Sequence, residues 1–103
     1  MIDKRYLDHD NRLHWNYFVD RIGKMQGVTL EEWYKRKDAI LEAELPFVVP
    51  MRRSQCDDVL MAALKDNSAG AWRSWADDGV FGLRFELEED AVFVRLMIEG
   101  PTA

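Results

Sequence analysis

The chain has 103 residues, enough for one domain spanning residues 1–103 and too few for two. Its hydrophobic share of 48% allows a buried core and argues against intrinsic disorder. No apolar run approaches the roughly 18 residues of a membrane span, and the mixed charge of the first residues is unlike a secretory signal. The single Cys56 cannot form an internal disulfide. These features predict a cytoplasmic protein that is not bound to a membrane.

The net charge of −5 is unevenly distributed along the chain. Residues 1–53 carry ten Lys/Arg and nine Asp/Glu, a net charge of +1, whereas residues 54–103 carry four and ten, a net charge of −6. A negative surface disfavours direct binding to nucleic acid and favours basic partners. Solubility alone is the alternative explanation of the same charge.

Two helices are predicted in the first half of the chain. Apolar residues at spacings of three and four predict a helix over residues 10–25, with Gly27 as its C-cap. The segment from Thr29 to Glu32 has the sequence of a capping box, in which the Thr29 hydroxyl accepts a hydrogen bond from the Glu32 amide. It predicts a second helix over residues 30–44.

The second helix is predicted to end before Pro46, because the residue that precedes a proline is pushed out of helical geometry. Its periodicity places Trp33 and Tyr34 toward the core and Lys37 in water.

Residues 47–49 lie between two prolines and fit a short edge strand. A third helix is predicted to begin at Ser54, with Asp57 and Asp58 at the positive end of its dipole. Cys56 lies on the apolar stripe of this helix and is predicted to be a buried core thiol.

The segment of residues 71–76 is predicted to form a helical turn. Trp72 and Trp75, three positions apart, would then share one face. Residues 77–79 contain two aspartates and a glycine and predict a turn.

In the last quarter of the chain, apolar residues occupy every second position of two segments, Phe81, Leu83, Phe85 and Leu87, then Val92, Val94, Leu96 and Ile98. This alternation predicts a β-hairpin closed by the acidic residues 88–90. The hairpin would place Arg84 opposite Arg95, a like-charge pair that either a salt bridge to Glu86 or an external anion would compensate. The predicted fold is α+β, with three helices followed by a C-terminal antiparallel β-hairpin and residues 47–49 as a candidate third strand at its edge.

No motif in the chain predicts a reaction, a cofactor or a metal. One cluster of residues could bind a metal, and it consists of Asp8, His9, Asp10 and His14. Structural zinc sites use four Cys or His ligands, whereas the chain has only two histidines and Cys56. A small metal-dependent enzyme built on this cluster is therefore a minor alternative to a protein that is not an enzyme.

The acidic half and its tryptophans predict a protein-binding surface. Tryptophan and arginine are common anchors of interfaces, while carboxylates steer a basic partner. The predicted partner-binding residues are Trp72, Arg73, Trp75, Asp77, Asp78, Glu88, Glu89, Asp90, Asp57 and Asp58. We therefore expect a non-enzymatic module that occupies a basic surface of another protein, such as an inhibitor of a nucleic-acid-binding system, phage-encoded for example, or an immunity-type protein.

The sequence also leaves two alternatives to this partner-binding interpretation. Trp72 and Trp75 could simply close the end of a small core. The chain could also be a structural or assembly subunit that self-associates through the outer face of its hairpin, where Phe93 and Met97 are predicted to lie.

Overall fold

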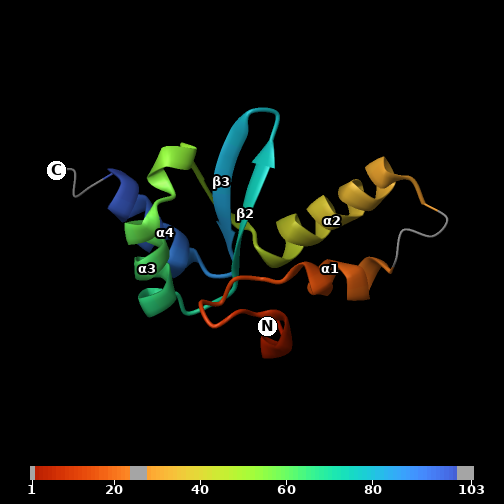
Figure 1. The fold of residues 1–103 in the computed structure, drawn as a ribbon, viewed down its shortest axis with the longest axis horizontal. Coiled ribbons are helices and arrows are strands. Elements are labelled where there is room, and N and C mark those ends of the chain that lie inside the picture. The colour runs from red at the N-terminus through yellow and green to blue at the C-terminus, as the bar shows by residue number, and fades with distance from the viewer. Residues whose placement is uncertain (1, 24–27, 100–103) are drawn as a thin grey trace.

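Two pairs of helices flank a three-stranded antiparallel sheet in the computed structural model, which describes residues 2–23 and 28–99 (Figure 1). The predicted α+β class is confirmed. In chain order the elements are η1 (Lys4–Tyr6, 3₁₀), α1 (Trp15–Ile22), α2 (Leu30–Glu44), β1 (Phe47–Met51), η2 (Arg53–Gln55, 3₁₀), α3 (Asp58–Asn67), β2 (Trp72–Asp77), β3 (Val80–Phe85) and α4 (Glu88–Glu99). In this part of the chain no helix has both the length and the apolar character that a membrane crossing requires.

The strand β3 lies in the middle of the sheet, between β1 and β2. It is joined to β2 by a tight turn in which Asp78 and Gly79 have positive φ values of 48° and 82°. Two positive φ values are typical of the hairpin turn whose twist matches that of the strands. The predicted turn at residues 77–79 and the predicted edge strand at residues 47–49 are both confirmed.

The prediction that residues 92–98 form a strand is wrong, because this segment lies in α4. Its apolar residues fit either period: Ala91, Val94 and Ile98 recur at helical spacing, and Val94 is fully buried while Val92 is 41% exposed. Three acidic residues in the first turn of α4 also favour a helix, because they lie at the positive end of its dipole.

The prediction of a helical turn over residues 71–76 is also wrong, because they contain β2. Side chains alternate along a strand, so Trp72 and Trp75 lie on opposite faces of the sheet and not on a shared one. Arg84 is consequently opposite Arg73, not Arg95.

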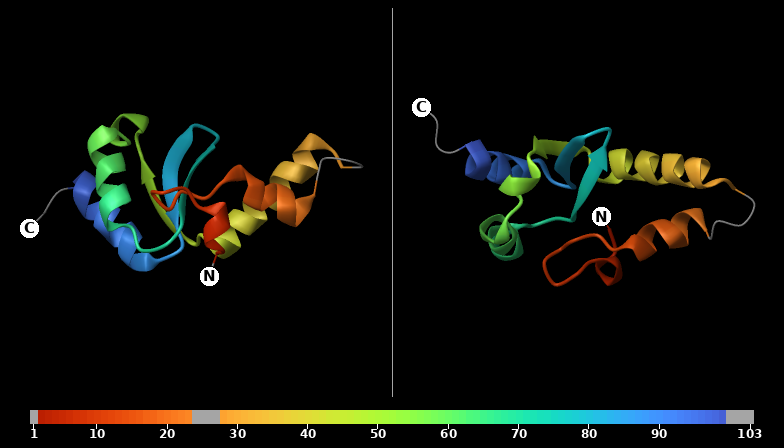
Figure 2. Two further views of the ribbon diagram at one scale, coloured as in Figure 1. Left: turned by 60° about the horizontal axis from the view of Figure 1, so that its bottom comes forward. Right: turned by 45° about the horizontal axis from the view of Figure 1, so that its top comes forward.

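One face of the sheet packs against α3 and α4 (Figure 2). The core on this side consists of Val49, Leu60, Leu64, Trp72, Leu83, Phe85, Ala91 and Val94. A second core joins α1, α2 and the N-terminal segment around Phe18 and Trp33. The α1 and α2 pair extends away from the sheet, which gives the molecule extents of 52 × 30 × 22 Å (Figure 2).

The structure confirms the predicted bounds of α2, and the Thr29 hydroxyl accepts a hydrogen bond from the Glu32 amide at 3.2 Å. The first helix is shorter than predicted and begins at Trp15, because the preceding residues pair as extended backbone with the start of β2. Its C-cap is Gly23, at a φ of 88°, whereas the predicted cap Gly27 lies outside the described residues.

The third helix begins at Asp58 and not at Ser54, which lies in η2. Asp57 is its N-cap, and the Asp57 carboxylate accepts a hydrogen bond from the Leu60 amide at 2.9 Å.

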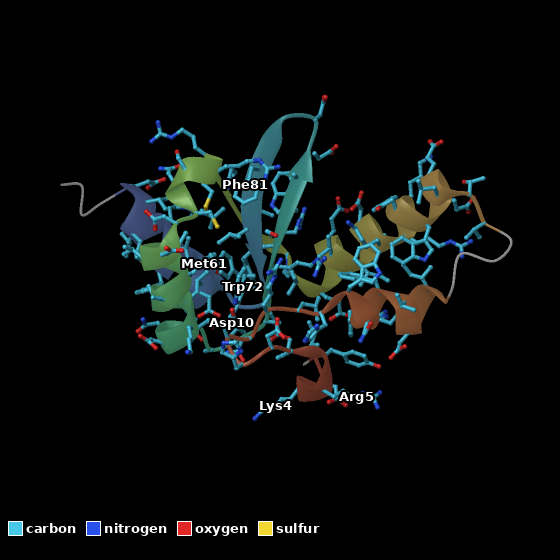
Figure 3. The ribbon with its side chains drawn as sticks, in the orientation of Figure 1. Lys4, Arg5, Asp10, Met61, Trp72 and Phe81 are labelled. Carbon is cyan, nitrogen blue, oxygen red and sulfur yellow. The ribbon has the colours of Figure 1, made fainter. Side chains whose placement is uncertain are left out.

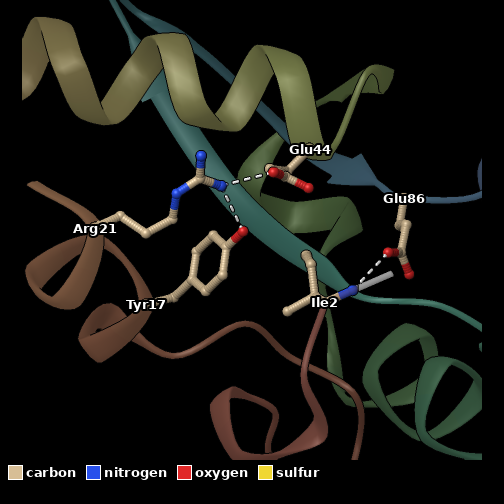
Figure 4. Close-up of polar contacts among 5 residues, drawn as sticks. All are labelled: Ile2, Tyr17, Arg21, Glu44 and Glu86. Carbon is tan, nitrogen blue, oxygen red and sulfur yellow. Dashed lines mark hydrogen bonds and ion pairs between the residues drawn. The ribbon is translucent and has the colours of Figure 1, made fainter.

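Two carboxylates at the end of the sheet bind backbone amides. Asp90 is 4% exposed and accepts hydrogen bonds from the amides of Ala69 and Gly70, the latter at 2.9 Å. Glu86 accepts from the amides of Ala71 and Ile2, each at 3.2 Å, and Figure 4 shows the contact with Ile2. The predicted salt bridge of Glu86 with Arg95 is therefore wrong, since Glu86 holds the N-terminal segment against the sheet.

Paired valine substitutions distinguish the helix from a strand at residues 92–98. We expect Val94→Ala to lower the free energy of unfolding by about 2 kcal/mol, because it leaves a cavity in the core. Val92→Ala should cost less than about 0.5 kcal/mol, because that side chain is partly in solvent. Urea unfolding of dilute protein measures both changes. Equal losses would favour a strand with both valines on one buried face.

Removing the buried carboxylate should destabilise the fold more than any exposed acidic substitution. Asp90→Ala leaves two backbone amides without an acceptor, and we expect a loss of about 3 kcal/mol. Asp90→Asn keeps one acceptor oxygen and should lose less. Glu89→Ala, the exposed neighbour, is the control, with an expected loss below about 1 kcal/mol. A loss for Asp90→Ala no larger than that of the control would contradict the structural role.

Candidate functional site

The ten predicted partner-binding residues do not form one surface. Trp72 is 2% exposed, and Asp90 is buried as well, so neither is available to a partner. Asp77 and Asp78 lie at the turn that joins β2 and β3, whereas Glu88 and Glu89 follow the other end of β3. Asp57 and Asp58 are exposed at the start of α3, and Arg73 and Trp75 are half-buried on the sheet.

The indole of Trp72 belongs to the interior. Its Nε1–H donates to the backbone oxygen of Asp10 at 2.8 Å, and the two residues lie side by side in Figure 3. Trp72 therefore lies in the core, which is the position that the alternative interpretation gave it.

Trp75 and Asp77, in contrast, line a groove between α2 and the face of the sheet that α3 and α4 leave uncovered. The groove has a volume of about 370 Å³. Its lining residues are Tyr34, Lys37, Asp38, Leu41, Glu42, Trp75, Ala76, Asp77 and Arg84. We call it the α2 groove.

The floor of the α2 groove is aromatic. The indole nitrogen of Trp75 lies over Gly82, where even a Cβ atom would come within 2.7 Å of the Val49 oxygen and 3.1 Å of Trp75 Nε1. Gly82 therefore leaves the space that the indole occupies. The Trp75 Nε1–H is buried and has no acceptor among the described residues.

Two cations hold the aromatic rings of the floor. The guanidinium carbon of Arg84 lies 5.7 Å from the centre of the Trp75 ring, and Arg84 also donates to the Leu45 backbone oxygen at 3.1 Å. The ammonium of Lys37 lies 5.0 Å from the centre of the Tyr34 ring. Both distances fall within the range of cation–π attraction.

Lys37 is more buried than its predicted place in water implies, since its side chain is only 17% exposed. Burial lowers the pKa of the Lys37 amine, the carboxylate of Asp38 partly opposes this shift, and the charge of Arg73 adds to it. Tyr34, which was predicted to face the core, is 43% exposed instead. The signal in the sequence was that Lys37 lies on the helix stripe of Trp33 and Leu41, at spacings of four.

Three carboxylates form the rim of the α2 groove: Asp38, Glu42 and Asp77. All three residues are exposed. Within the described residues, only Asp38 has a cation within 4 Å, the Lys37 ammonium at 3.9 Å. The lining therefore carries three negative and two positive charges, with the negative ones outermost.

The metal-capable residues near the N-terminus form a local contact. The imidazole of His14 lies within ion-pair distance of the Asp8 carboxylate, and no group of three or more candidate ligands was found among residues 2–23 and 28–99. Cys56 is partly buried against the core, and burial, reinforced by Asp57, raises the pKa of its thiol. A raised pKa disfavours the thiolate that nucleophilic chemistry requires.

Comparisons of the chain with protein-family models, with curated proteins and with solved structures found no match. The functional argument therefore rests on the chemistry of the α2 groove.

Proposed function

We propose that the chain is a non-enzymatic protein-binding module that takes a basic segment of a partner protein into the α2 groove. The observation that carries this proposal is the arrangement of the groove, in which exposed carboxylates of Asp38, Glu42 and Asp77 surround a floor of Trp75 and Tyr34. A lysine or arginine side chain pairs its charge with such a rim and packs its aliphatic part on aromatic rings.

The floor is prepared for binding before a partner arrives. Arg84 lies against Trp75 and is itself held by the Leu45 backbone oxygen, and Lys37 lies against Tyr34. Rings that are already fixed lose little conformational entropy when a ligand covers them. Their inner contacts are occupied by the protein's own cations, so a partner's cation is expected to pair with the carboxylates of the rim.

The wider surface supports the attraction of a basic partner. All ion pairs among the described residues lie within residues 3–44. The exposed carboxylates of the second half, including Asp58, Asp78, Glu88 and Glu89, thus have no cation within 4 Å in this part of the chain. Their combined field raises the rate of encounter with a positively charged surface, while rim contacts determine where the partner binds. Toxins and nucleic-acid-binding proteins have such basic surfaces, so an immunity-type protein or an inhibitor fits the proposal.

A display library of random peptides tests this function and requires no identified partner. We expect selection on the wild-type chain at low salt to enrich peptides with several lysines or arginines. The affinity of an enriched peptide should fall as salt is raised, because exposed ion pairs are screened over about 10 Å at 0.1 M salt.

Neutralising the rim should weaken that peptide's binding selectively. The variant Asp38→Asn, Glu42→Gln, Asp77→Asn should raise the Kd at least about tenfold at low salt, because three charge pairs are lost. The matched control, Asp58→Asn, Asp66→Asn, Glu89→Gln, removes the same charge outside the groove and should change the Kd less than about threefold. Isothermal titration calorimetry measures both. Equal weakening by the two variants, or enrichment of peptides without basic residues, would overturn the proposal.

A further inference from the structure

Two apolar side chains are exposed on the outer face of α4. Val92 is 41% exposed and Leu96 is 58% exposed. Val92 also lines a second groove, of about 270 Å³, with Glu88, Ala91 and Arg95 from α4 and residues 46–48 from the start of β1. Two such side chains, one turn apart on the helix, are available for burial against another molecule.

The edge of the sheet at this groove is also unpaired. The strand β1 is one of the two outer strands in the order β1-β3-β2, so backbone groups of every second residue point away from β3. No further backbone hydrogen bond of residues 46–51 was found among the described residues. A free edge of this kind is normally covered or otherwise protected, because it accepts another chain.

The charges beside Val92 complement a second copy of the same helix. Glu88, Val92 and Arg95 follow one stripe of α4, at spacings of four and three, and all three line the groove. Among the described residues, neither Glu88 nor Arg95 has an ion-pair partner within 4 Å. The seven-residue interval between them corresponds to about 10 Å along the helix axis.

Antiparallel packing of two α4 helices would satisfy this pattern. If the two-fold axis passes beside Val92, Glu88 of each copy lies opposite Arg95 of the other, and the two Val92 side chains meet at the centre. Such an interface is closed, because each surface uses the same residues on both copies.

We propose that the chain forms a two-fold dimer through the outer face of α4, held by two Glu88–Arg95 ion pairs around Val92, with Leu96 and the edge of β1 covered at the same interface. This proposal does not depend on the proposed function, since the α2 groove lies on the other face of the sheet. The dimer face also differs from the predicted self-association surface, because Phe93 packs against the core.

Sedimentation equilibrium over a range of protein concentrations tests the dimer. We expect the wild-type chain to change from monomer to dimer as its concentration rises. Either Glu88→Arg or Arg95→Glu should raise the dimer Kd at least about tenfold, because two attractive pairs become two repulsive ones. The double variant with both changes restores the pairs in exchanged order and should recover a Kd within about threefold of the wild type.

Two controls match the charge changes of the single variants. Asp66→Arg and Lys65→Glu alter α3 outside the interface and should leave the Kd within about threefold of the wild type. Circular dichroism of each variant verifies that it is folded. A chain that stays monomeric at all concentrations would overturn the proposal and leave the face to a different partner. A dimer that tolerates both single variants, or that the double variant does not restore, would equally overturn it.

Discussion

The pairing of β3 with both of its neighbours determines which surfaces the molecule has. The register places Leu83 and Phe85 on the face that packs against α3 and α4, and it places Gly82 and Arg84 on the opposite face. A shift by one residue would exchange these sets and bury Arg84 in the apolar core. The hydrophobic core and the aromatic floor of the α2 groove are thus two consequences of one register.

The acidic residues of the second half have two separate roles. Asp57, Glu86 and Asp90 accept hydrogen bonds from backbone amides, and their carboxylates stabilise a helix start, the N-terminal segment and the loop before β2. A carboxylate so occupied contributes to folding and is not free to bind a partner. The other exposed carboxylates of the second half accept no hydrogen bond from a backbone amide among the described residues. Their charge is therefore available to another molecule. Sequence composition alone does not separate these roles, because both kinds of residue add the same unit to the net charge.

Local signals in the sequence predicted the local features of the fold. The bounds of α2 and the turn at Asp78 depend on capping and turn chemistry within a few residues, and both are confirmed. Residues 92–98 were predicted wrongly, because their apolar spacing satisfies a strand and a helix equally and tertiary packing decides between them. The α2 groove shows the same limit, because its composition depends on which elements pack side by side. Trp75 and Asp77 were predicted as contact residues, but Lys37 joins them only because α2 lies beside the sheet.

The two proposed surfaces are compatible with each other. The α2 groove opens on the face of the sheet away from α3 and α4, whereas the Glu88–Arg95 stripe lies beside the edge of β1. A dimer formed through α4 would therefore keep both of its α2 grooves free. Two grooves in one particle bind a partner with repeated basic segments much more tightly than either groove alone, provided that the spacing of the segments matches. Dimerisation would then increase the apparent affinity for an extended basic surface without any additional contact in the groove itself.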